Sequence, residues 1–458
     1  MRRQVANLVR LDPAFFGFRR RAVAQVIKDT LRAAWFTCFA KSTRRSVDSI
    51  DAGFERMTIT AAPLFHGEPL LEHLLRERTL FPDWTDLSGT VRVCSAEATL
   101  HRVKPLLARM GITRVGLIDG LDCTGLPVAV CYRPNSRHLS SGQGKGVSKD
   151  LAIASAVMEC IEGYHMEQPR QVVAQARYDD IRGTHEAVDP STLAPGYFTA
   201  KPVEDFVFDW SQATNLVDGT NTLVPSCLVT LDYSSLIPAT NLLSITSNGV
   251  ASGNCLSEAI CHGILEVIER DSLSKWTALP NTQRDETRIQ LSSIPPGPVR
   301  ELIDKFRSAG VDVMLWDMSV DGLDIAVINC AGTSSLGAHG GSGAHFSREV
   351  AILRALAELA QSRAVWISGS RDDLYRGKYS KQRRPRHKRS ADAKGRRLYS
   401  DIPDNAHLQR FEEALAALMQ KLIKRGYRQI LACNHTMPEF NVPVVQVIIP
   451  GMAIQHDR

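Results

Sequence analysis

Hydrophobic side chains recur with a helical period in five segments of the chain. Residues 148–166, 256–277 and 347–364 place apolar residues three and four positions apart over several turns. Residues 99–111 and 405–426 carry the same period. The pattern therefore predicts five helices after residue 91, of which all but 99–111 are long.

Short runs of β-branched and aromatic residues lie between these helices. Interpreted as strands, they cover residues 112–118, 126–132, 223–231, 311–318, 323–332, 428–435 and 442–451. Helices and strands alternate without a regular βαβ rhythm, so the pattern predicts an α+β fold with mixed sheets. No internal repeat is evident at a fixed period, although two of the helices carry similar carboxylate patterns.

The charge of the chain is distributed unevenly. Of 458 residues, 44% are hydrophobic and 23% are charged, a globular balance that excludes a disordered, collagen-like or disulfide-scaffold protein. The net charge of +6 combines +7 on residues 1–56 and +10 on residues 376–397 with −11 on the remainder. The net negative charge of the remaining residues suits a carboxylate site for metal ions. The simpler interpretation of these charges is a solvated protein surface.

These charge differences suggest how the chain is divided. We predict a basic N-terminal extension at 1–56, a lead-in segment at 57–90 and a main domain at 91–458 with a basic insertion at 376–397. The extension either forms an amphipathic helix near 20–36 or precedes a true start at Met57. The insertion is interpreted as a surface loop or as a docking site for an acidic peptide or partner. The scarcity of aromatic residues among its charges argues against nucleic-acid binding.

The cysteines and the apolar runs indicate the cellular compartment. The ten cysteines are scattered without a Cys-x-x-Cys pair, which favours a reducing environment and argues against a zinc site. No apolar run reaches the length of a membrane span, and arginines interrupt the N-terminal apolar residues. We therefore expect a cytoplasmic protein without a membrane segment.

Glutamates lie within two of the long, largely apolar helices. Glu159 and Glu162 share one face of the first helix. The second helix carries a further carboxylate stripe with Arg270 beside it and Asn254 just before it; its members are Glu258, Glu266 and Glu269. Carboxylates in apolar surroundings are costly unless they are paired or bind a metal, and such oxygen ligands suit Mg²⁺.

Two other segments carry groups that suit phosphate. Arg354, Glu358 and Gln361 share one face of the third helix, and Arg363 follows them. Before the first helix, the glycine-rich segment 140–146 surrounds Lys145 and offers backbone N–H groups and a charge, although its spacing is not that of a Walker A loop. Each helix alone is explained by solvated ion pairs, but together they favour a nucleotide site.

Four sequence segments resemble the YcaO family. They are GITRVGLIDGLDCTGLPVAVCYRPNSRHLSSGQGKG, SAVMECIEGYH, SNGVASGNCLSEAICHGILEVIERDS and ALAELAQSRAVWISGSRDD, in the family's order, and the resemblance extends over about residues 91–450. It implies a YcaO-type ATP-binding fold with long glutamate-bearing helices. It also implies that ATP phosphorylates the oxygen of a peptide backbone amide, which a nucleophile then attacks.

The resemblance also implies roles for individual residues. Lys145 and Ser148 correspond to contacts on the phosphate side. The metal-binding glutamates correspond to Glu159, Glu162, Glu258, Glu266 and Glu269. The remaining nucleotide contacts correspond to Asn254, Arg270, Gln361 and Arg363. The first motif of the family usually ends in Glu-Arg, whereas here Gly163 replaces the arginine; no catalytic residue is identified.

The resemblance suggests which reaction the protein supports. The chain looks like a stand-alone member that lacks a Pro-x-Pro-x-Pro end, similar to members that work with a TfuA-like partner and a sulfide source. We expect ATP- and Mg²⁺-dependent thioamide formation on a peptide or protein substrate. The alternatives are an azoline-forming cyclodehydratase subunit acting on a ribosomally made precursor and a non-catalytic ATP-binding regulatory protein. The family also suggests a homodimer.

Overall fold

The computed structural model describes residues 84–193, 203–234, 243, 245–374, 376–380, 395–406 and 408–452. All of them belong to the larger of two units in the chain, residues 63–458. The predicted N-terminal extension at 1–56, its helix near 20–36, most of the lead-in segment and the centre of the basic insertion lie outside the described residues.

The long helices predicted at 148–166, 256–277 and 347–364 are confirmed, whereas the one predicted at 405–426 is shorter and begins at Phe411. The described helices are α5 (Ala96–Val103), α6 (Lys149–Met166), α7 (Tyr178–Ile181), α8 (Leu256–Ala278), α9 (Asn281–Glu286), α10 (Pro298–Ser308), α11 (Arg348–Ser368), α12 (Arg376–Ser380) and α13 (Phe411–Lys424). The helix predicted at 99–111 was wrong in its extent, because α5 ends at Val103 and Pro105 lies in a following 3₁₀ turn. Proline has no N–H to continue the helical hydrogen bonds.

The predicted α+β class is confirmed, but the described strands pair only antiparallel, so the predicted mixed sheets were wrong. The strands are β1 (Thr85–Asp86), β2 (Val91–Arg92), β3 (Arg114–Leu117), β4 (Val128–Tyr132), β5 (Ser141–Lys145), β6 (Ala174–Ala176), β7 (Phe208–Asn215), β8 (Asn221–Pro225), β9 (Val250–Ser252), β10 (Asp312–Asp317), β11 (Ala326–Ser334), β12 (Gly337–His345), β13 (Leu431–Asn434) and β14 (Val444–Ile448). Their orders are β1-β2, β3-β4-β5, β10-β11-β12 and β6-β7-β13-β14-β9, with β8 paired to β7.

The glycine-rich segment before α6 is a strand, not the flexible loop predicted from sequence. Gly142 and Gly144 lie in β5, where a side chain at Gly144 would overlap backbone atoms of Ala152 and Ala156 in α6. The glycines of β12 approach α11 in the same way. Glycine therefore permits close contact between strand and helix here, instead of presenting N–H groups to a phosphate.

Three units of similar construction recur in the structure. In each, the edge strand of a three-stranded antiparallel arrangement leads into a long helix: β3-β4-β5 into α6, β13-β14-β9 into α8, and β10-β11-β12 into α11. The N-cap residues are Ser148, Cys255 and Ser347. The units are unequally spaced, and β13 and β14 come from the end of the chain, so no fixed period exists in the sequence.

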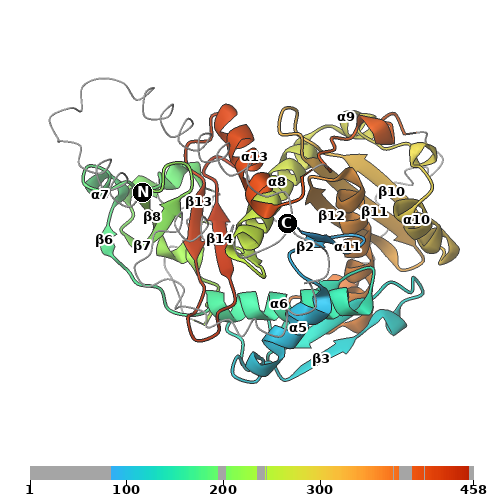
Figure 1. The fold of residues 1–458 in the computed structure, drawn as a ribbon, viewed down its shortest axis with the longest axis horizontal. Helices are drawn as coiled ribbons and strands as arrows, with labels where there is room; N and C mark the ends of the chain where they lie inside the picture. Colours follow the sequence, from blue (N-terminus) through green and yellow to red (C-terminus); the bar gives the residue numbers. More distant parts are fainter. Residues whose placement is uncertain are drawn as a thin grey trace, which may run out of the picture. The chain divides into compact units, whose positions relative to one another are not determined.

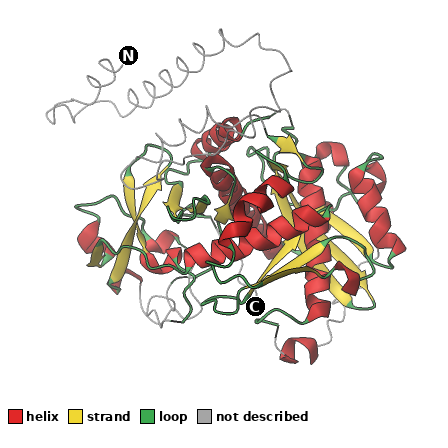
Figure 2. Cartoon of the chain, turned by 60° about the horizontal axis from the view of Figure 1, so that its bottom comes forward, coloured by secondary structure: helices red, strands yellow, loops and turns green. Residues whose placement is uncertain are grey.

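Each long helix packs within its own apolar core. Buried residues of α8 pack against β14, β10 and β11, those of α11 pack against β10, β11 and α10, and those of α6 pack against β4 and α5. In Figure 1, α8 lies between β13–β14 and the β10–β12 sheet, and α6 passes beneath both. Figure 2 shows the long helices in the middle, with strands on either side.

Candidate functional site

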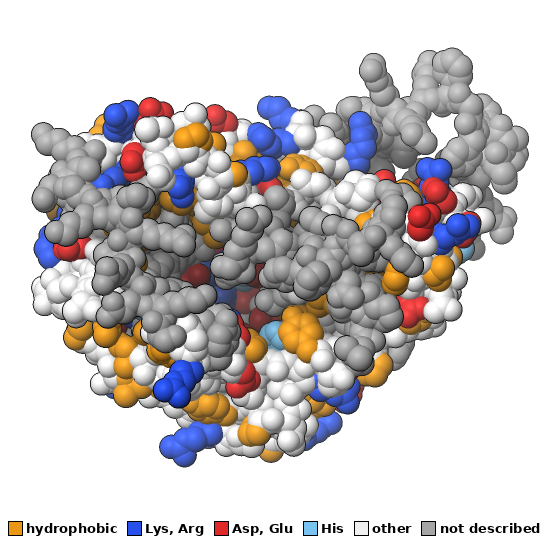
Figure 3. Space-filling view, turned by 180° about the vertical axis from the view of Figure 1, so that it is seen from behind, with side chains coloured by type: hydrophobic (Ala, Val, Ile, Leu, Met, Phe, Trp, Pro, Cys, Tyr) orange, Lys and Arg blue, Asp and Glu red, His pale blue; other side chains and the backbone are white. Residues whose placement is uncertain are grey.

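Three glutamates at equivalent helix positions approach one another. Glu159, Glu266 and Glu358 each lie eleven positions after the N-cap of α6, α8 or α11, as their numbers and those of the caps show. Glu358 lies close enough to raise the pKa of both other carboxyls by electrostatic repulsion. Lys145 forms an ion pair with Glu358. Figure 3 shows acidic, basic and histidine side chains at the bottom of a hollow. The three units thus bring one carboxylate each to a common region.

The carboxyls of α6 and α8 have raised pKa values despite some positive charge nearby: Arg270 lies 3.9 Å from Glu266, and Lys145 acts electrostatically on Glu159 and Glu266. The surrounding protein raises the pKa of Glu159 to about 7, that of Glu162 to about 8 and that of Glu266 to about 7, chiefly by desolvation. Neighbouring carboxylates add to the shift, as Glu159 and Glu266 do for Glu162. The Glu159 side chain is nevertheless exposed, so solvent limits the effect of burial on its pKa and the carboxylate lies at the surface rather than in a closed core. This side of the hollow is suited to a cation.

The α11 side of the hollow carries positive charge. Burial opposes the ionisation of Glu358, but Lys145, Arg270 and Arg354 outweigh it and lower the pKa of this carboxyl. The Nε of Arg354 is buried and has no hydrogen-bond partner among the described residues. A buried guanidinium nitrogen without a partner is costly, and an anion in the hollow would satisfy it.

Two of the predicted metal ligands are occupied by protein groups. Glu258 is 1% exposed; its Oε2 accepts a hydrogen bond from the Val93 N–H at 3.0 Å, and its Oε1 lies 3.6 Å from the Nε of Arg92. Glu269 is 5% exposed; it accepts from the Ser342 hydroxyl at 2.6 Å and from the Ala344 N–H at 2.9 Å. These carboxylates hold neighbouring strands in this structure.

Asn254 also has protein partners. Its Oδ1 accepts hydrogen bonds from the Thr99 hydroxyl at 2.9 Å and from Arg102 at 2.8 Å, and its Nδ2 donates to Glu258 at 3.3 Å. Thr99 and Arg102 belong to α5. Asn254 therefore joins α5 to the start of α8.

The remaining predicted contacts are distributed over the structure. Ser148 is exposed and caps α6, accepting from the Leu151 N–H at 3.3 Å. Gln361 donates to the Gln143 carbonyl at 2.9 Å. Arg363 is 1% exposed and directs its guanidinium at Asp122, with N–O distances of 2.8 and 2.9 Å, and at Ser334. The Arg363 guanidinium is therefore already bound by Asp122 and Ser334.

Some charged residues near the hollow were missed or left without a role by the sequence analysis. Arg92 comes from the two-residue strand β2, which has no hydrophobic pattern, and lies beside His262. Burial and the charges of Arg92 and Arg354 lower the pKa of His262 well below its ordinary value and that of His345 to about 3. Their spacing in sequence offers no signal, because only the fold brings β2, α8, β12 and α11 together.

The carboxylates present fit Mg²⁺. Among the described residues, no three His, Cys, Asp or Glu side chains are placed to hold one metal ion together. Mg²⁺ does not need such a cage, because it binds through one or two carboxylates together with water and phosphate oxygens. One or two of Glu159, Glu162 and Glu266 would hold it together with water and phosphate oxygens, since these carboxyls have raised pKa values.

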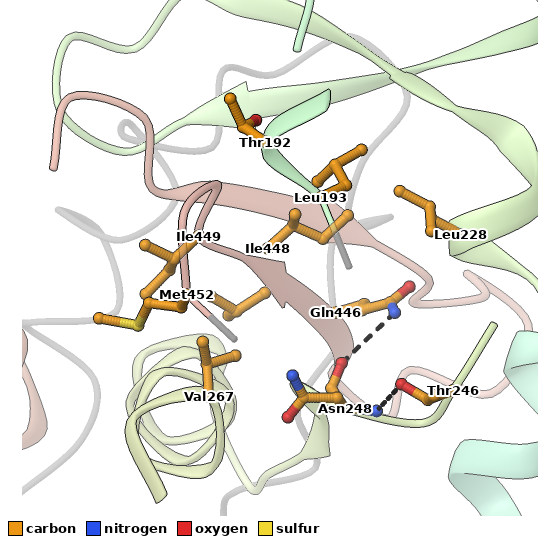
Figure 4. Close-up of a pocket in the computed structure, with 11 residues that line it drawn as sticks. Thr192, Leu193, Leu228, Thr246, Asn248, Val267, Gln446, Ile448, Ile449 and Met452 are labelled. Carbon is orange, nitrogen blue, oxygen red and sulfur yellow. Dashed lines mark hydrogen bonds between the residues drawn. The ribbon is translucent and has the colours of Figure 1, made fainter. Parts of the chain in front are cut away.

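Another pocket lies apart from these charged groups. It has a volume of about 50 Å³ and is lined by residues such as Thr192, Val267, Gln446 and Met452 (Figure 4). No ionisable side chain is among its described lining residues, so it is not a candidate for phosphate or metal. The nine described cysteines are free thiols. No described helix combines the length and apolar character needed to cross a membrane.

Comparison with known sequences gives consistent relatives. The family model described as YcaO cyclodehydratase, ATP- and Mg²⁺-binding, matches residues 143–453. A protein encoded in the tfuA 3′ region of Rhizobium leguminosarum bv. trifolii is 32% identical over 381 residues, which cover 79% of this chain and 89% of the relative. A protein of Methanothermobacter thermautotrophicus is 32% identical over 372 residues, covering 78% and 93%.

Solved structures share the fold. YcaO from Methanopyrus kandleri, bound with AMPPCP and Mg²⁺, is similar with a TM-score of 0.64 and 20% identity over 81% of this chain and 94% of that one. A heterocyclase in complex with substrate and cofactor has a TM-score of 0.63 and 19% identity over 84% of this chain and 56% of that one. The expected ligands, ATP and Mg²⁺, are those in the family's description. The chain therefore belongs to the YcaO family.

Proposed function

We propose that the hollow binds Mg²⁺ and ATP and that the protein uses them to activate a peptide backbone amide. The observation that carries this proposal is the cluster of carboxyls with raised pKa values at Glu159, Glu162 and Glu266. They lie on α6 and α8, near the equivalent glutamate of α11, Glu358. Such an arrangement is unfavourable without a cation. Membership of a family described as ATP- and Mg²⁺-binding supports the same conclusion.

The polarity of the hollow suggests how the nucleotide lies. The cation belongs beside α6 and α8, where burial raises the pKa values of Glu162 and Glu266, the latter despite Arg270 at 3.9 Å. The phosphates belong nearer α11, where Lys145, Arg270 and Arg354 act together on Glu358. Lys145 is then released from Glu358 toward a phosphate oxygen, and Arg354 gains the partner that its Nε lacks. Arg363 is not included, because Asp122 and Ser334 already occupy it.

The chemistry follows from the weak reactivity of an amide. The amide oxygen forms a bond to the γ-phosphorus as the bond to the bridging oxygen of ADP breaks. Mg²⁺ held by the carboxylates of α6 and α8 would neutralise the charge that develops on the phosphates. A nucleophile then adds to the amide carbon, and the oxygen leaves as phosphate. The described residues serve to orient the phosphates and balance charge, and no side chain needs to form a covalent bond.

The nucleophile that we favour is sulfide, supplied with the help of a TfuA-like partner, which gives a thioamide. The relative encoded in a tfuA 3′ region supports this choice. The family description as cyclodehydratases supports a second candidate, in which a neighbouring Cys, Ser or Thr of the peptide attacks and an azoline forms. Both products share the phosphorylated intermediate, so the nucleotide site is the same for each.

Mass spectrometry of a reacted peptide distinguishes the products. The protein is incubated with Mg²⁺, ATP, sulfide, the TfuA-like partner and a candidate precursor peptide. Exchange of oxygen for sulfur adds about 16 Da, whereas loss of one water to form an azoline removes about 18 Da. A gain supports thioamide formation and a loss supports the cyclodehydratase. ATP consumption without any change in peptide mass, over a panel of precursors, would contradict both.

A further inference from the structure

The three long helices are joined to one another by residues at one equivalent position. Glu162, Glu269 and Gln361 each lie fourteen positions after the N-cap of α6, α8 or α11, one turn beyond the converging glutamates. Residues three apart share one face of a helix. The same turn of each helix therefore carries one side chain for the hollow and one for a neighbouring unit.

Each of these side chains bonds to the strand that precedes the next helix. Glu162 of α6 accepts from the N–H and hydroxyl of Ser252 in β9, at 2.8 and 2.6 Å. Glu269 of α8 accepts from Ser342 and Ala344 of β12, at 2.6 and 2.9 Å.

The third link has the same direction. Gln361 of α11 donates to the Gln143 carbonyl of β5 at 2.9 Å. The sequence of links runs from α6 to the α8 unit, from α8 to the α11 unit, and from α11 back to the α6 unit. The links therefore close a ring.

We propose that Glu162, Glu269 and Gln361 are positioning residues that close a ring of three units, and that this ring holds Glu159, Glu266 and Glu358 around the hollow. Closure of the ring is a property of the protein alone. The consequence for the nucleotide rests on the proposed function. Glu162 has a second role, because its Oε1 takes both bonds to Ser252 and leaves Oε2 without a hydrogen bond to any described residue.

Gln361 shows why one position of the ring is not a carboxylate. Its partner is a carbonyl oxygen, which only a donor can bind, whereas the partners of Glu162 and Glu269 are N–H and hydroxyl groups. The N–H of the same residue, Gln143, donates to Oε2 of Glu159 at 3.1 Å. Gln361 therefore acts on Glu159 through the backbone of residue 143 and positions a carboxylate of the proposed metal side.

This inference predicts a specific defect in Gln361→Met, which keeps the length of the side chain but removes the donor. Without ligand, hydrogen exchange measured by mass spectrometry should accelerate in residues 141–145. The Mg²⁺ concentration that half-saturates ATP binding should rise about three- to tenfold, the effect expected for one lost hydrogen bond. Saturating Mg²⁺ should restore ATP affinity, and Gln361→Lys, which regains a donor, should restore slow exchange.

The matched control is Gln168→Met. Gln168 also donates to a backbone carbonyl at 2.9 Å, but that carbonyl, of Tyr164, belongs to the same helix. This variant should leave both measurements unchanged. Unchanged exchange in Gln361→Met, with ATP affinity lost at every Mg²⁺ concentration, would overturn the proposal in favour of direct nucleotide contact. If the wild-type protein binds no ATP, the proposed function fails, and the exchange measurement still decides whether the ring is closed by Gln361.

Discussion

At the scale of single residues, the site is defined by which charges have partners. Glu258 and Glu269 are buried and fully engaged by protein groups. Glu159 and Glu266 have raised pKa values although Arg270 lies 3.9 Å from Glu266, and Lys145 forms an ion pair with Glu358. Glutamates on the same helices thus serve two purposes, because some hold neighbouring protein elements and others are proposed to bind a cation.

The raised pKa values predict how stability depends on pH. Glu266 has a pKa of about 7 in the folded protein against a usual value near 4.5, so the folded state retains this proton to higher pH than the unfolded state. The free energy of unfolding should therefore fall as pH rises toward 7 and level off above it. Glu159 and Glu162 act in the same direction, with values of about 7 and 8.

Thermal unfolding at pH 5, 6, 7 and 8 without Mg²⁺ tests this expectation. The decline in melting temperature between pH 5 and 8 should be smaller in Glu266→Gln than in the wild-type protein, and Mg²⁺ with ATP should also reduce it. Glu301→Gln, at an exposed position of α10, should follow the wild type. Identical declines in all three proteins would show that Glu266 does not hold a proton at neutral pH.

At the scale of elements, close contact between strand and helix sets the geometry. A side chain at Gly144 would meet the backbone of α6, which cannot move aside without shifting Glu159. The corresponding glycines of β12, Gly341 and Gly343, meet α11 in the same way. These glycines determine how deeply each strand packs, and so where the carboxylates lie.

Gly144→Ala should therefore destabilise the protein by about 1–3 kcal/mol, the usual cost of overpacking. Gly116→Ala is a matched control, because Gly116 also lies in a strand of this sheet but no atom lies within 4 Å of its added methyl group. Urea unfolding measures both. Equal stability of the two variants would mean that β5 does not pack against α6 as described.

The elements also show what could be predicted from sequence. The three long helices and their glutamates were identified because apolar spacing and carboxylate spacing are local signals. Residues 141–145 were predicted to be a flexible loop but form strand β5. Glycine is common both in loops and in strands that pack closely on a helix, so the sequence does not distinguish the two. Arg92 was missed, since β2 is too short to show a period and its contact with Glu258 depends on the tertiary fold. The partner of Gln361 is non-local in the same way.

At the scale of the whole molecule, three units contribute residues to the proposed site, and other parts are attached around them. The predicted basic insertion, 376–397, is anchored at both ends. The ring centroids of Tyr379 and Trp366 lie 4.3 Å apart, and the Nε of Arg397 lies 3.0 Å from an oxygen of Asp317 in an ion pair. Every group assigned to the nucleotide site comes from outside this segment.

We therefore expect replacement of residues 381–394 by a short Gly/Ser linker to leave the affinity for ATP unchanged. Removal of all of 376–397 should lower the melting temperature, because it deletes both anchors. Calorimetry and thermal unfolding on the two variants measure these effects. Loss of ATP binding in the shorter deletion would place part of the insertion in the site.

The most direct test of the central claim is calorimetric titration of ATP into the protein with and without Mg²⁺. The wild-type protein should bind ATP only weakly without Mg²⁺. With Mg²⁺, Glu266→Gln should weaken binding by about tenfold or more, equivalent to ~1.4 kcal/mol or greater, while Glu301→Gln should bind as the wild type does. Equal ATP affinity in all three proteins, or binding that does not depend on Mg²⁺, would contradict the assignment of the hollow as the ATP and Mg²⁺ site.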